Sequence, residues 1–368
     1  MIQAPIYIGS EVFREAAFGS NHPLNIVRHS AVVDLVRILD WLPEQDYRTS
    51  EPATVEQLTE FHDRTYVEVL QYADSTGKVS PEDRARYQIG TLENPLFPGL
   101  FNRAAMTVSG SILAAELALE GHVVFHPSGG THHGRPDRAC GFCYFNDPVF
   151  AINTFLQQGC ERVMYVDLDA HHGDGVESAF AADSRVLTVS IHEEDRWPYS
   201  GSADDRREGC ARNLPVPKGF NDDELDYLIE HAVLPLAASF KPDALVLCCG
   251  ADCLAGDPLS GMRLSNVALW NTVDKFIALR EPTVVLGGGG YNPWTVARYW
   301  AGLWGRLSGQ DFPLRLPEEA LKMFEKMSCD LIDEEDVEED WIRTLVDSPY
   351  NGPVREAIKS LATEIVRT

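Results

Sequence analysis

The sequence predicts an α/β fold in which a parallel β-sheet is covered by helices on both faces. Three features of the 368-residue chain support this prediction. Apolar runs of strand length recur through its middle, amphipathic stretches of helix length alternate with them, and glycine or proline marks most of the junctions. Parallel strands need long crossover connections and are buried on both faces, so this alternation is typical of a large α/β domain.

The elements can be assigned in order along the chain. The apolar runs expected to be strands are residues 122–125, 163–166, 186–191, 244–249 and 283–286. The stretches expected to be helices are residues 101–120, 147–158, 222–240, 265–280 and 293–307. Glycine or proline follows the first four of these stretches within two residues, and Pro293 begins the fifth, which is typical of helix ends and starts.

No stretch rich in serine, glycine or proline divides the chain, and no internal repeat is present. We therefore expect a main part at residues 1–310 and an acidic C-terminal appendage at 311–368 that packs on the same domain. The predicted boundary lies within residues 308–313. The acidic run DEEDVEED at 333–340 is expected to be a solvent-exposed helix face or loop, because neighbouring like charges repel one another and favour hydration.

The charge balance argues against two classes of partner. The chain has 31 Lys and Arg residues against 56 Asp and Glu residues, a formal net charge of −25. Such a surface repels phosphate backbones and anionic lipids, so nucleic acid and membranes are not expected partners, whereas cationic substrates would be tolerated or attracted. The first residues lack a basic segment followed by an apolar one, and no apolar run approaches the roughly 20 residues of a membrane span, so we expect a cytoplasmic protein.

The eight cysteines are expected to be free thiols, as is usual in the cytosol. Cys248 and Cys249 lie in an apolar run, where core packing explains them. Cys140 and Cys143 have CxxC spacing, but no second pair completes a tetrathiolate zinc site, so we favour a structural role over a redox or metal role.

Polar residues of unusual kinds follow four of the predicted strands. The segments are HPSGGTHHG after 122–125, DLDAHHGDG after 163–166, GADCLAGD after 244–249 and GGGGYNPW after 283–286. Ligands of open parallel sheets bind outside the carboxyl ends of the strands. The four segments should therefore meet in one crevice.

Two carboxylates and one imidazole in these segments form a candidate metal site. Asp169 and His171 are two residues apart at a strand end, so their side chains point to the same side, and Asp252 could supply a third ligand from another strand. Three protein ligands leave a position for water, which is typical of a catalytic site where the ion lowers the pKa of the water and polarises a carbonyl. The alternative is that these aspartates only cap helices or tie loops together.

Two further imidazoles could serve as acid and base. His132 and His133 lie on a glycine-flanked loop. Asp167 and Asp174 could each hold one imidazole by its second nitrogen, which fixes the tautomer and raises the basicity. Tyr291 follows four glycines, which let the backbone approach closely, and its hydroxyl could donate to a developing oxyanion. Taken singly, each of these side chains could instead lie at the surface or pack in the core.

Together, the segments resemble the histone deacetylase family, in its bacterial branch with acetylpolyamine amidohydrolases and acetoin-utilisation deacetylases. The resemblance extends over about residues 22–309 and is carried by HPLNIVR, ENPLFPG, HPSGGTHHG, GFCYFND, YVDLDAHHGDGVE, SIH, GADCLAGDPL and LGGGGYN. It implies a three-layer α/β/α fold of the arginase/deacetylase type, with a deacetylase catalytic domain at 1–310. It also implies one Zn²⁺ per chain, for which Fe²⁺ could substitute, and structural K⁺ or Na⁺.

The resemblance also implies roles for the polar residues. The three candidate ligands match the zinc ligands of the family. His132, paired with Asp167, matches the imidazole that accepts the water proton or supports it electrostatically. His133, paired with Asp174, matches the imidazole that protonates the leaving amine, although which of the two is the base stays open. Tyr291 matches the tyrosine that binds the substrate carbonyl.

The substrate tunnel is implied in the same way. Gly141 and Phe142 resemble one wall of an acyl-lysine tunnel. The opposing aromatic wall falls at Trp197, but RWPYSGS departs from the usual Phe-Pro-Gly of the family, so Tyr199 is an alternative. Glu93 falls at an acidic rim position, where it could hold the substrate backbone or attract a polyamine nitrogen.

Other matched positions concern ions and product. Arg28 in HPLNIVR matches the arginine near the exit for acetate. Monovalent cations bind in this family largely through main-chain oxygens. The inner cation site is matched by Asp167, Asp169, His171, Ser190 and Ile191. The outer cation site is matched in part by Phe180, Asp183 and Val186.

The expected reaction is hydrolysis of an N-acyl amide, with acylated lysine in proteins as the first choice of substrate. The alternative is an acetylpolyamine or another small acylated amine. No long insertion lies between Arg84 and Asn94, where polyamine-specific relatives often narrow the entrance, and this favours the protein substrate. An arginase-like enzyme with two manganese ions would need further aspartates near Asp252, and an inactive binding module would be expected to lack Tyr291 or His133. The oligomeric state and the preferred acyl chain stay open.

Overall fold

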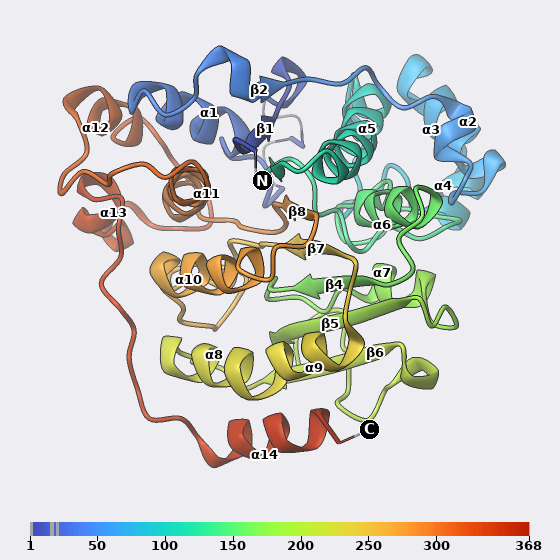
Figure 1. Cartoon of the computed structure of the whole chain (residues 1–368). Helices are drawn as coiled ribbons and strands as arrows, with labels where there is room; N and C mark the ends of the chain where they lie inside the picture. The colour runs from blue at the N-terminus through green and yellow to red at the C-terminus, as the bar shows by residue number, and fades with distance from the viewer. Residues whose placement is uncertain (1–2, 15–17, 20–21, 368) are drawn as a thin grey trace.

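A computed structural model describes residues 3–14, 18–19 and 22–367 of the chain. Within them, one sheet has the strand order β2-β1-β3-β8-β7-β4-β5-β6, and every neighbouring pair is parallel (Figure 1). The strands are β1 Ile6–Ile8, β2 Tyr47–Arg48, β3 Val123–His126, β4 Val163–Asp167, β5 Val186–Glu193, β6 Ala211–Val216, β7 Ala244–Cys248 and β8 Thr283–Leu286. The predicted α/β fold with a parallel sheet is confirmed.

The helices lie before, between and after these strands. They are α1 His29–Ile38, α2 Val55–Leu58, α3 Arg64–Thr76, α4 Pro81–Tyr87, α5 Leu100–Leu119, α6 Asp147–Gln157, α7 Asp174–Ala179, α8 Asp222–Leu228, α9 Leu234–Phe240, α10 Asn266–Ile277, α11 Pro293–Leu307, α12 Glu318–Phe324, α13 Glu339–Arg343 and α14 Glu356–Ile365.

The two faces of the sheet are buried by different helices, which gives the three layers. Along β4, Met164 and Val166 point into one apolar cluster, and Val163 and Tyr165 point into another. Successive side chains of a strand alternate between faces, so a strand that is apolar throughout must be covered on both. α5 and α6 cover the face of Val163, and α1, α8, α9, α10 and α11 cover the face of Met164 (Figure 1).

The predicted strands are all present, with ends that shift by at most two residues, while β1, β2 and β6 were not predicted. β2 and β6 are the edges of the sheet. β6 reads ARNLPV, and the charged, polar and proline residues that hide it in the sequence are tolerated at an edge. The helix predicted at 222–240 is divided into α8, a π-helical turn at Ile229–Val233, and α9. Pro235, in the first turn of α9, has no amide hydrogen to continue the helical bonding.

The described part of the C-terminal region packs on the helical layer of α11. α12 contacts α1, α13 contacts α11, and α14 contacts α8 and β6. The buried guanidinium of Arg298 on α11 binds Asp347 at 2.6 Å and donates to Thr344 O at 2.7 Å. The acidic run 333–340 is largely exposed, as predicted. A division of the chain at residue 310 stays a prediction.

The length and polarity of a helix decide whether it could span a membrane. Among the described residues, no helix is both long enough and apolar enough to cross a bilayer.

Candidate active site

The sheet order brings the four polar segments together. β3, β8, β7 and β4 are consecutive neighbours in the sheet, and the segments follow their carboxyl ends. Parallel strands end at a common edge, so the segments line one edge of the sheet, where ligands of such folds bind.

Asp169, His171 and Asp252 converge on one point of this edge. Each offers one ligand atom, these atoms lie within 4.8 Å of one another, and all three residues are buried. His171 Nδ1 lies 2.9 Å from Asp252 Oδ2 and 3.3 Å from Asp169 Oδ1. Backbone amides orient the carboxylates, because Gly289 N–H donates to Asp169 Oδ2 at 2.6 Å and Ala170 N–H donates to Asp252 Oδ1 at 2.9 Å.

The electrostatics of this group favour a bound cation. Burial and the charge of Asp169 raise the pKa of Asp252 to about 6. Burial opposes a charge on His171, but its hydrogen bonds with Asp169 and Asp252 raise its pKa to about 10. Two buried carboxylates at this distance are unfavourable unless a positive charge lies between them. The set of two carboxylates and one imidazole therefore fits a divalent ion such as Zn²⁺.

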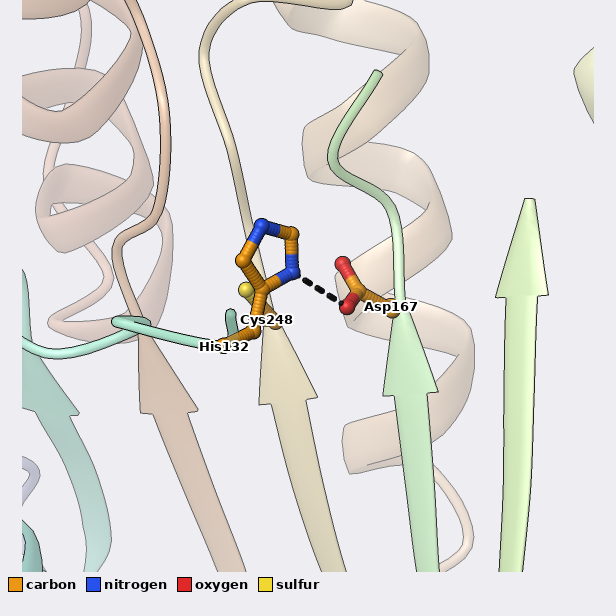
Figure 2. Close-up of side chains that lie close together, drawn as sticks. All are labelled: His132, Asp167 and Cys248. Carbon is orange, nitrogen blue, oxygen red and sulfur yellow. Dashed lines mark hydrogen bonds and ion pairs between the residues drawn. The ribbon is translucent and has the colours of Figure 1, made fainter. Parts of the chain in front are cut away.

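His132 lies beside the candidate metal site and is oriented by a carboxylate. Its Nδ1–H donates to Asp167 Oδ2 at 2.7 Å (Figure 2). Its Nε2 lies 3.8 Å from Asp169 Oδ1. Asp167 Oδ2 also accepts from the Tyr165 hydroxyl at 2.7 Å, which fixes the carboxylate. Although burial opposes it, the charges of Asp167 and Asp169 raise the pKa of His132 to about 9.

His132, Asp167 and Cys248 form a second close group, with ligand atoms within 4.8 Å of one another (Figure 2). Hydrogen bonds already occupy these atoms: His132 Nδ1 binds Asp167, and Cys248 Sγ donates to Gly287 O at 3.4 Å. Burial raises the pKa of the Cys248 thiol well above its usual value, so the metal-binding thiolate is disfavoured. We therefore interpret the group as a hydrogen-bonded cluster that supports His132.

His133 is oriented by a second carboxylate. Its Nδ1–H donates to Asp174 Oδ1 at 2.8 Å, and its ring centroid lies 3.9 Å from that of His132. Arg135 binds Asp174 Oδ2 and also donates to Asp174 O at 3.1 Å. Burial and the adjacent His132 lower the pKa of His133 to about 4, against the effect of Asp174.

Tyr291 lies close to the candidate metal ligands Asp169, His171 and Asp252 because of the glycines before it. Its ring centroid lies 6.4 Å from that of His171, and its N–H donates to Asp257 Oδ2 at 2.7 Å. A Cβ at Gly289 would lie 2.2 Å from Asp252 Oδ2, so this approach of the backbone requires glycine. Burial and the charge of Asp252 raise the pKa of Tyr291 well above its usual value, so the hydroxyl stays protonated and can donate.

A groove, here called the outer groove, reaches the site from the surface. Its lining includes Glu93, His133, Gly141, Phe142, His171, Trp197, Tyr199 and Tyr291. The ring of Trp197 lies 4.6 Å from that of His133 and 6.2 Å from that of His171. Tyr199 is 78 % exposed. Of the two aromatic residues left open by the sequence, Trp197 is therefore the one that lies against the metal group.

A tight turn also lines the outer groove. Cys140 and Cys143 exchange two backbone hydrogen bonds, of 3.0 and 2.9 Å, around Gly141 and Phe142, whose φ values are 55° and 66°. Two consecutive residues with positive φ form a type I′ turn, which explains the spacing of the CxxC segment without a metal. A Cβ at Gly141 would lie 2.4 Å from the Trp197 ring.

A cavity of about 110 Å³, here called the inner cavity, shares Phe142, His133 and Tyr291 with the outer groove but extends to other residues. Arg28 lines it. The Arg28 Nη2 donates to Gly288 O at 2.5 Å, and its guanidinium carbon lies 5.0 Å from the centroid of the Trp300 ring. The arginine is therefore attached to the glycine run beside the metal group.

The positions matched to monovalent cations lie in and beside β4, β5 and α7. Asp167 and Ser190 are partners in the β4–β5 ladder. Phe180, Asp183 and Val186 are linked by backbone hydrogen bonds of 3.0 Å, and the Asp183 carboxylate pairs with Arg185 at 2.7 Å. Cation binding at these positions stays a prediction.

Some residues that shape the site were not anticipated. Tyr165 was interpreted only as a strand residue, and Arg135 carried no signal beyond its place after the HHG motif. Asp257, in the GADCLAGD segment, was given no role, whereas it accepts from the Tyr291 backbone N–H. Asn94 is buried and its Oδ1 accepts from Phe142 N–H at 3.0 Å, so it anchors the turn in the groove.

Comparisons with known proteins agree with this arrangement. A family model described as the histone deacetylase domain matches residues 22–307. The acetoin utilization protein AcuC of Bacillus subtilis is 30 % identical over 336 residues, which cover 87 % of this chain and 86 % of that protein. Histone deacetylase 8 of Xenopus tropicalis is 31 % identical over 323 residues, which cover 85 % of this chain and 86 % of that protein.

A solved structure extends the likeness to the whole fold. The crystal structure of an HDAC homolog from Aquifex aeolicus superimposes with a TM-score of 0.95 and 32 % sequence identity, over 99 % of this chain and 100 % of that chain. The three-layer arrangement implied by the sequence motifs is thereby confirmed.

Proposed function

This chain belongs to the histone deacetylase family, and we propose that it is a zinc-dependent amidohydrolase that removes acetyl groups from the ε-amine of lysine in proteins. The observation that carries the proposal is the convergence of Asp169, His171 and Asp252 within 4.8 Å at the end of a groove that also contains His133 and Tyr291. When bound, a zinc ion at these ligands would lower the pKa of a water molecule and polarise the substrate carbonyl.

The protein side chains supply the proton transfers. The low pKa of His133 keeps its Nε2 unprotonated at neutral pH, so this atom can accept a proton as water attacks the carbonyl carbon. The same atom can then give the proton to the amine as the C–N bond breaks, leaving a carboxylate and a free amine. His132, whose Nδ1–H donates to Asp167, supports the developing negative charge.

Tyr291 supplies the donor for the oxyanion. Its protonated hydroxyl can bind the carbonyl oxygen, an interaction that strengthens as the oxygen becomes negative. We expect Tyr291→Phe to lower kcat about 10²–10³-fold, the usual effect of removing one oxyanion donor. Tyr72→Phe is the control, because Tyr72 is 64 % exposed on α3. Near-normal turnover by Tyr291→Phe would contradict this role.

The outer groove favours a substrate with a long aliphatic arm. Phe142 and Trp197 would flank the arm, and Glu93 could hold the substrate at the rim. Leu92, next to it, is 98 % exposed, so the rim is open to a large substrate such as a protein. The alternative substrate is an acetylpolyamine, which the acidic rim and the net charge of −25 would also attract.

Kinetics would decide between these substrates. The zinc-loaded enzyme is expected to show a higher kcat/KM for an acetyl-lysine peptide than for N-acetylputrescine, and the reverse order would support the polyamine alternative. Elemental analysis separates the deacetylase from the arginase-like alternative, because about one zinc is expected per chain and not two manganese ions. Asp257, the further carboxylate in the GAD segment, already accepts from the backbone amides of Leu259 and Tyr291.

A further inference from the structure

The main chain of Tyr291, which carries the proposed oxyanion donor, is bound on both sides. Its N–H donates to Asp257 Oδ2 at 2.7 Å, and its carbonyl oxygen accepts from Cys329 Sγ at 3.5 Å. Both partners are buried. Asp257 follows β7, whereas Cys329 lies in the C-terminal region, 38 residues beyond Tyr291. Two segments that are distant in sequence therefore fix the same residue.

An indole from the C-terminal region covers the turn that carries Asp257. Trp341, on α13, is buried, and a Cβ at Gly256 would lie 2.3 Å from its Cζ2 atom. The φ of Gly256 is 88°, so both the backbone conformation and the contact with the indole require glycine. Gly256 O accepts from Asn292 Nδ2 at 3.0 Å. Trp341 therefore covers a turn that is hydrogen-bonded both to Tyr291 and to the residue after it.

Further contacts fix Trp341 against the start of α11. Its ring centroid lies 6.3 Å from that of Trp294, with an angle of 25° between the ring planes. Trp294 is in the first turn of α11, and its Nε1–H donates to Phe324 O at 3.0 Å. α13 contacts α11, as Figure 1 shows. Buried side chains packed in this way transmit a change of volume to their neighbours, so a smaller side chain at Trp341 should displace the turn.

These contacts come from residues outside the part of the chain that matches the family. The family model ends at residue 307, whereas Phe324, Cys329 and Trp341 follow it. None of the three is among the described residues that line the outer groove or the inner cavity. An effect of these residues on the reaction would therefore act through Tyr291 and not through contact with the substrate.

We propose that Trp341 and Cys329 are positioning residues of the deacetylase, which hold the Tyr291 hydroxyl where the oxyanion forms. The inference rests on the proposed function, since it requires that Tyr291 donates to the oxyanion. Such a donor stabilises the transition state only at hydrogen-bond distance from the developing charge, so a small shift of the backbone weakens it. A residue that acts in this way affects kcat more than KM.

The first test replaces Trp341 in the zinc-loaded full chain, with an acetyl-lysine peptide as substrate. We expect Trp341→Leu to lower kcat about 10-fold and to change KM less than about two-fold, since a misplacement of about 1 Å can cost about 10²-fold. Trp341→Phe keeps an aromatic ring over Gly256 and should lower kcat less. The zinc content of both variants should stay that of the wild type, because the Ala170 N–H still orients Asp252.

Trp41→Leu is the matched control. Trp41 is 5 % exposed and Trp341 is 6 % exposed, so the two substitutions remove indoles of equal burial. Trp41 stacks on Phe312 and lies against Gly305, near the other end of α11. Trp41→Leu should therefore lower the Tm as Trp341→Leu does and leave kcat unchanged.

A double-mutant cycle separates positioning from a general loss of stability. Tyr291→Phe removes the hydroxyl, so Trp341→Leu should lower the kcat of this variant by less than about two-fold. Cys329→Ala, which removes the S–H donor to Tyr291 O, should lower the wild-type kcat about two-fold and leave the kcat of Tyr291→Phe unchanged. A residue that serves only folding would lower kcat by the same factor in both backgrounds.

Hydrogen exchange of the Tyr291 amide protects the test from differences in overall stability. This amide should exchange faster in Trp341→Leu than in the wild type, because local opening of the turn releases it from Asp257. In Trp41→Leu it should exchange as in the wild type. If Trp341→Leu does not fold, Trp341→Phe and Cys329→Ala carry the same comparison.

The outcomes separate this inference from the proposed function. An unchanged kcat in the Trp341 and Cys329 variants would contradict the inference alone. An equal loss of kcat with and without the Tyr291 hydroxyl would also contradict it, and so would a loss of zinc from Trp341→Leu, which would place the effect at Asp252. Failure of the zinc-loaded wild type to hydrolyse both the acetyl-lysine peptide and N-acetylputrescine would contradict the proposed function itself.

Discussion

The two imidazole–aspartate pairs of the site share their geometry and differ in their electrostatics. In each pair Nδ1–H donates to a carboxylate, at 2.7 Å from His132 to Asp167 and at 2.8 Å from His133 to Asp174. Yet the pKa of His132 is raised to about 9 and the pKa of His133 is lowered to about 4. Both imidazoles are buried, so burial does not explain the difference.

The charged neighbours of each pair explain the difference between the two pKa values. Asp169 adds a second negative charge 3.8 Å from His132 Nε2. Asp174, in contrast, shares its charge with Arg135, and His133 also faces His132. The same pairing can therefore hold one imidazole protonated and its neighbour neutral, and a third group decides which. Because a bound cation would offset the charge of Asp169, the two pKa values should lie closer together in the metal-loaded protein.

The largest expected effect comes from removing each imidazole in turn. We expect His133→Ala to lower kcat about 10²–10⁴-fold, as loss of a general acid–base does, and His132→Ala to lower it less. Wild-type activity should decline at acidic pH as His133 becomes protonated, and His132→Ala should keep this acidic limb. Steady-state kinetics across pH, on variants shown to retain zinc, would measure both effects. A larger loss in His132→Ala would reverse the assigned roles.

His62 offers an imidazole outside the site whose hydrogen-bond partners are backbone groups. Its Nδ1–H donates to Arg135 O at 2.9 Å, and its Nε2 accepts from Asn146 N–H at 3.1 Å. Burial lowers the pKa of His62 to about 4, similar to that of His133. Burial is the largest cause in both cases, and at His133 the charge of His132 opposes the raising effect of Asp174.

His62 should therefore make stability depend on pH. Between about 6.5 and 4 the unfolded chain binds a proton that the folded chain does not, so the free energy of unfolding should fall on acidification, by about 3 kcal/mol from this residue. His62→Gln, whose amide can still donate and accept, should show a shallower fall. Urea unfolding at several pH values would measure how the free energy of unfolding changes with pH. The same pH dependence in His62→Gln and in the wild type would contradict the buried neutral state of His62.

The smallest expected effect concerns Arg135. Arg135→Met leaves the Asp174 charge unshared, so the pKa of His133 should rise by about one unit, equivalent to about 1.4 kcal/mol. NMR titration of the His133 ring would detect the shift. Arg138→Met is the matched control, since Arg138 pairs with Asp137 and is 44 % exposed at its side chain. A pKa that does not move would show that Arg135 only holds the loop.

Much of the fold and of the metal group follows from patterns close together in the sequence. Five strands of the sheet interior were predicted because strands buried on both faces are apolar throughout. The interior strand β1, which has only three residues, and the edge strand β6 were not predicted. Asp169 and His171 were predicted to converge because residues two apart at a strand end point the same way. The pairing of each histidine with its aspartate was also anticipated from the motifs.

Sequence alone was sufficient for the class of fold and the family, because each depends on residue type and short spacing. Contacts between distant segments decided the rest. The packing of segments that are distant in sequence decides three features. They are which of Trp197 and Tyr199 faces the candidate metal ligands, which aspartate shares its charge with Arg135, and that Arg28 and Arg103 line one cavity. The physical reason is that pKa values and cavity shape change over a few ångströms, a scale that the order of residues does not specify.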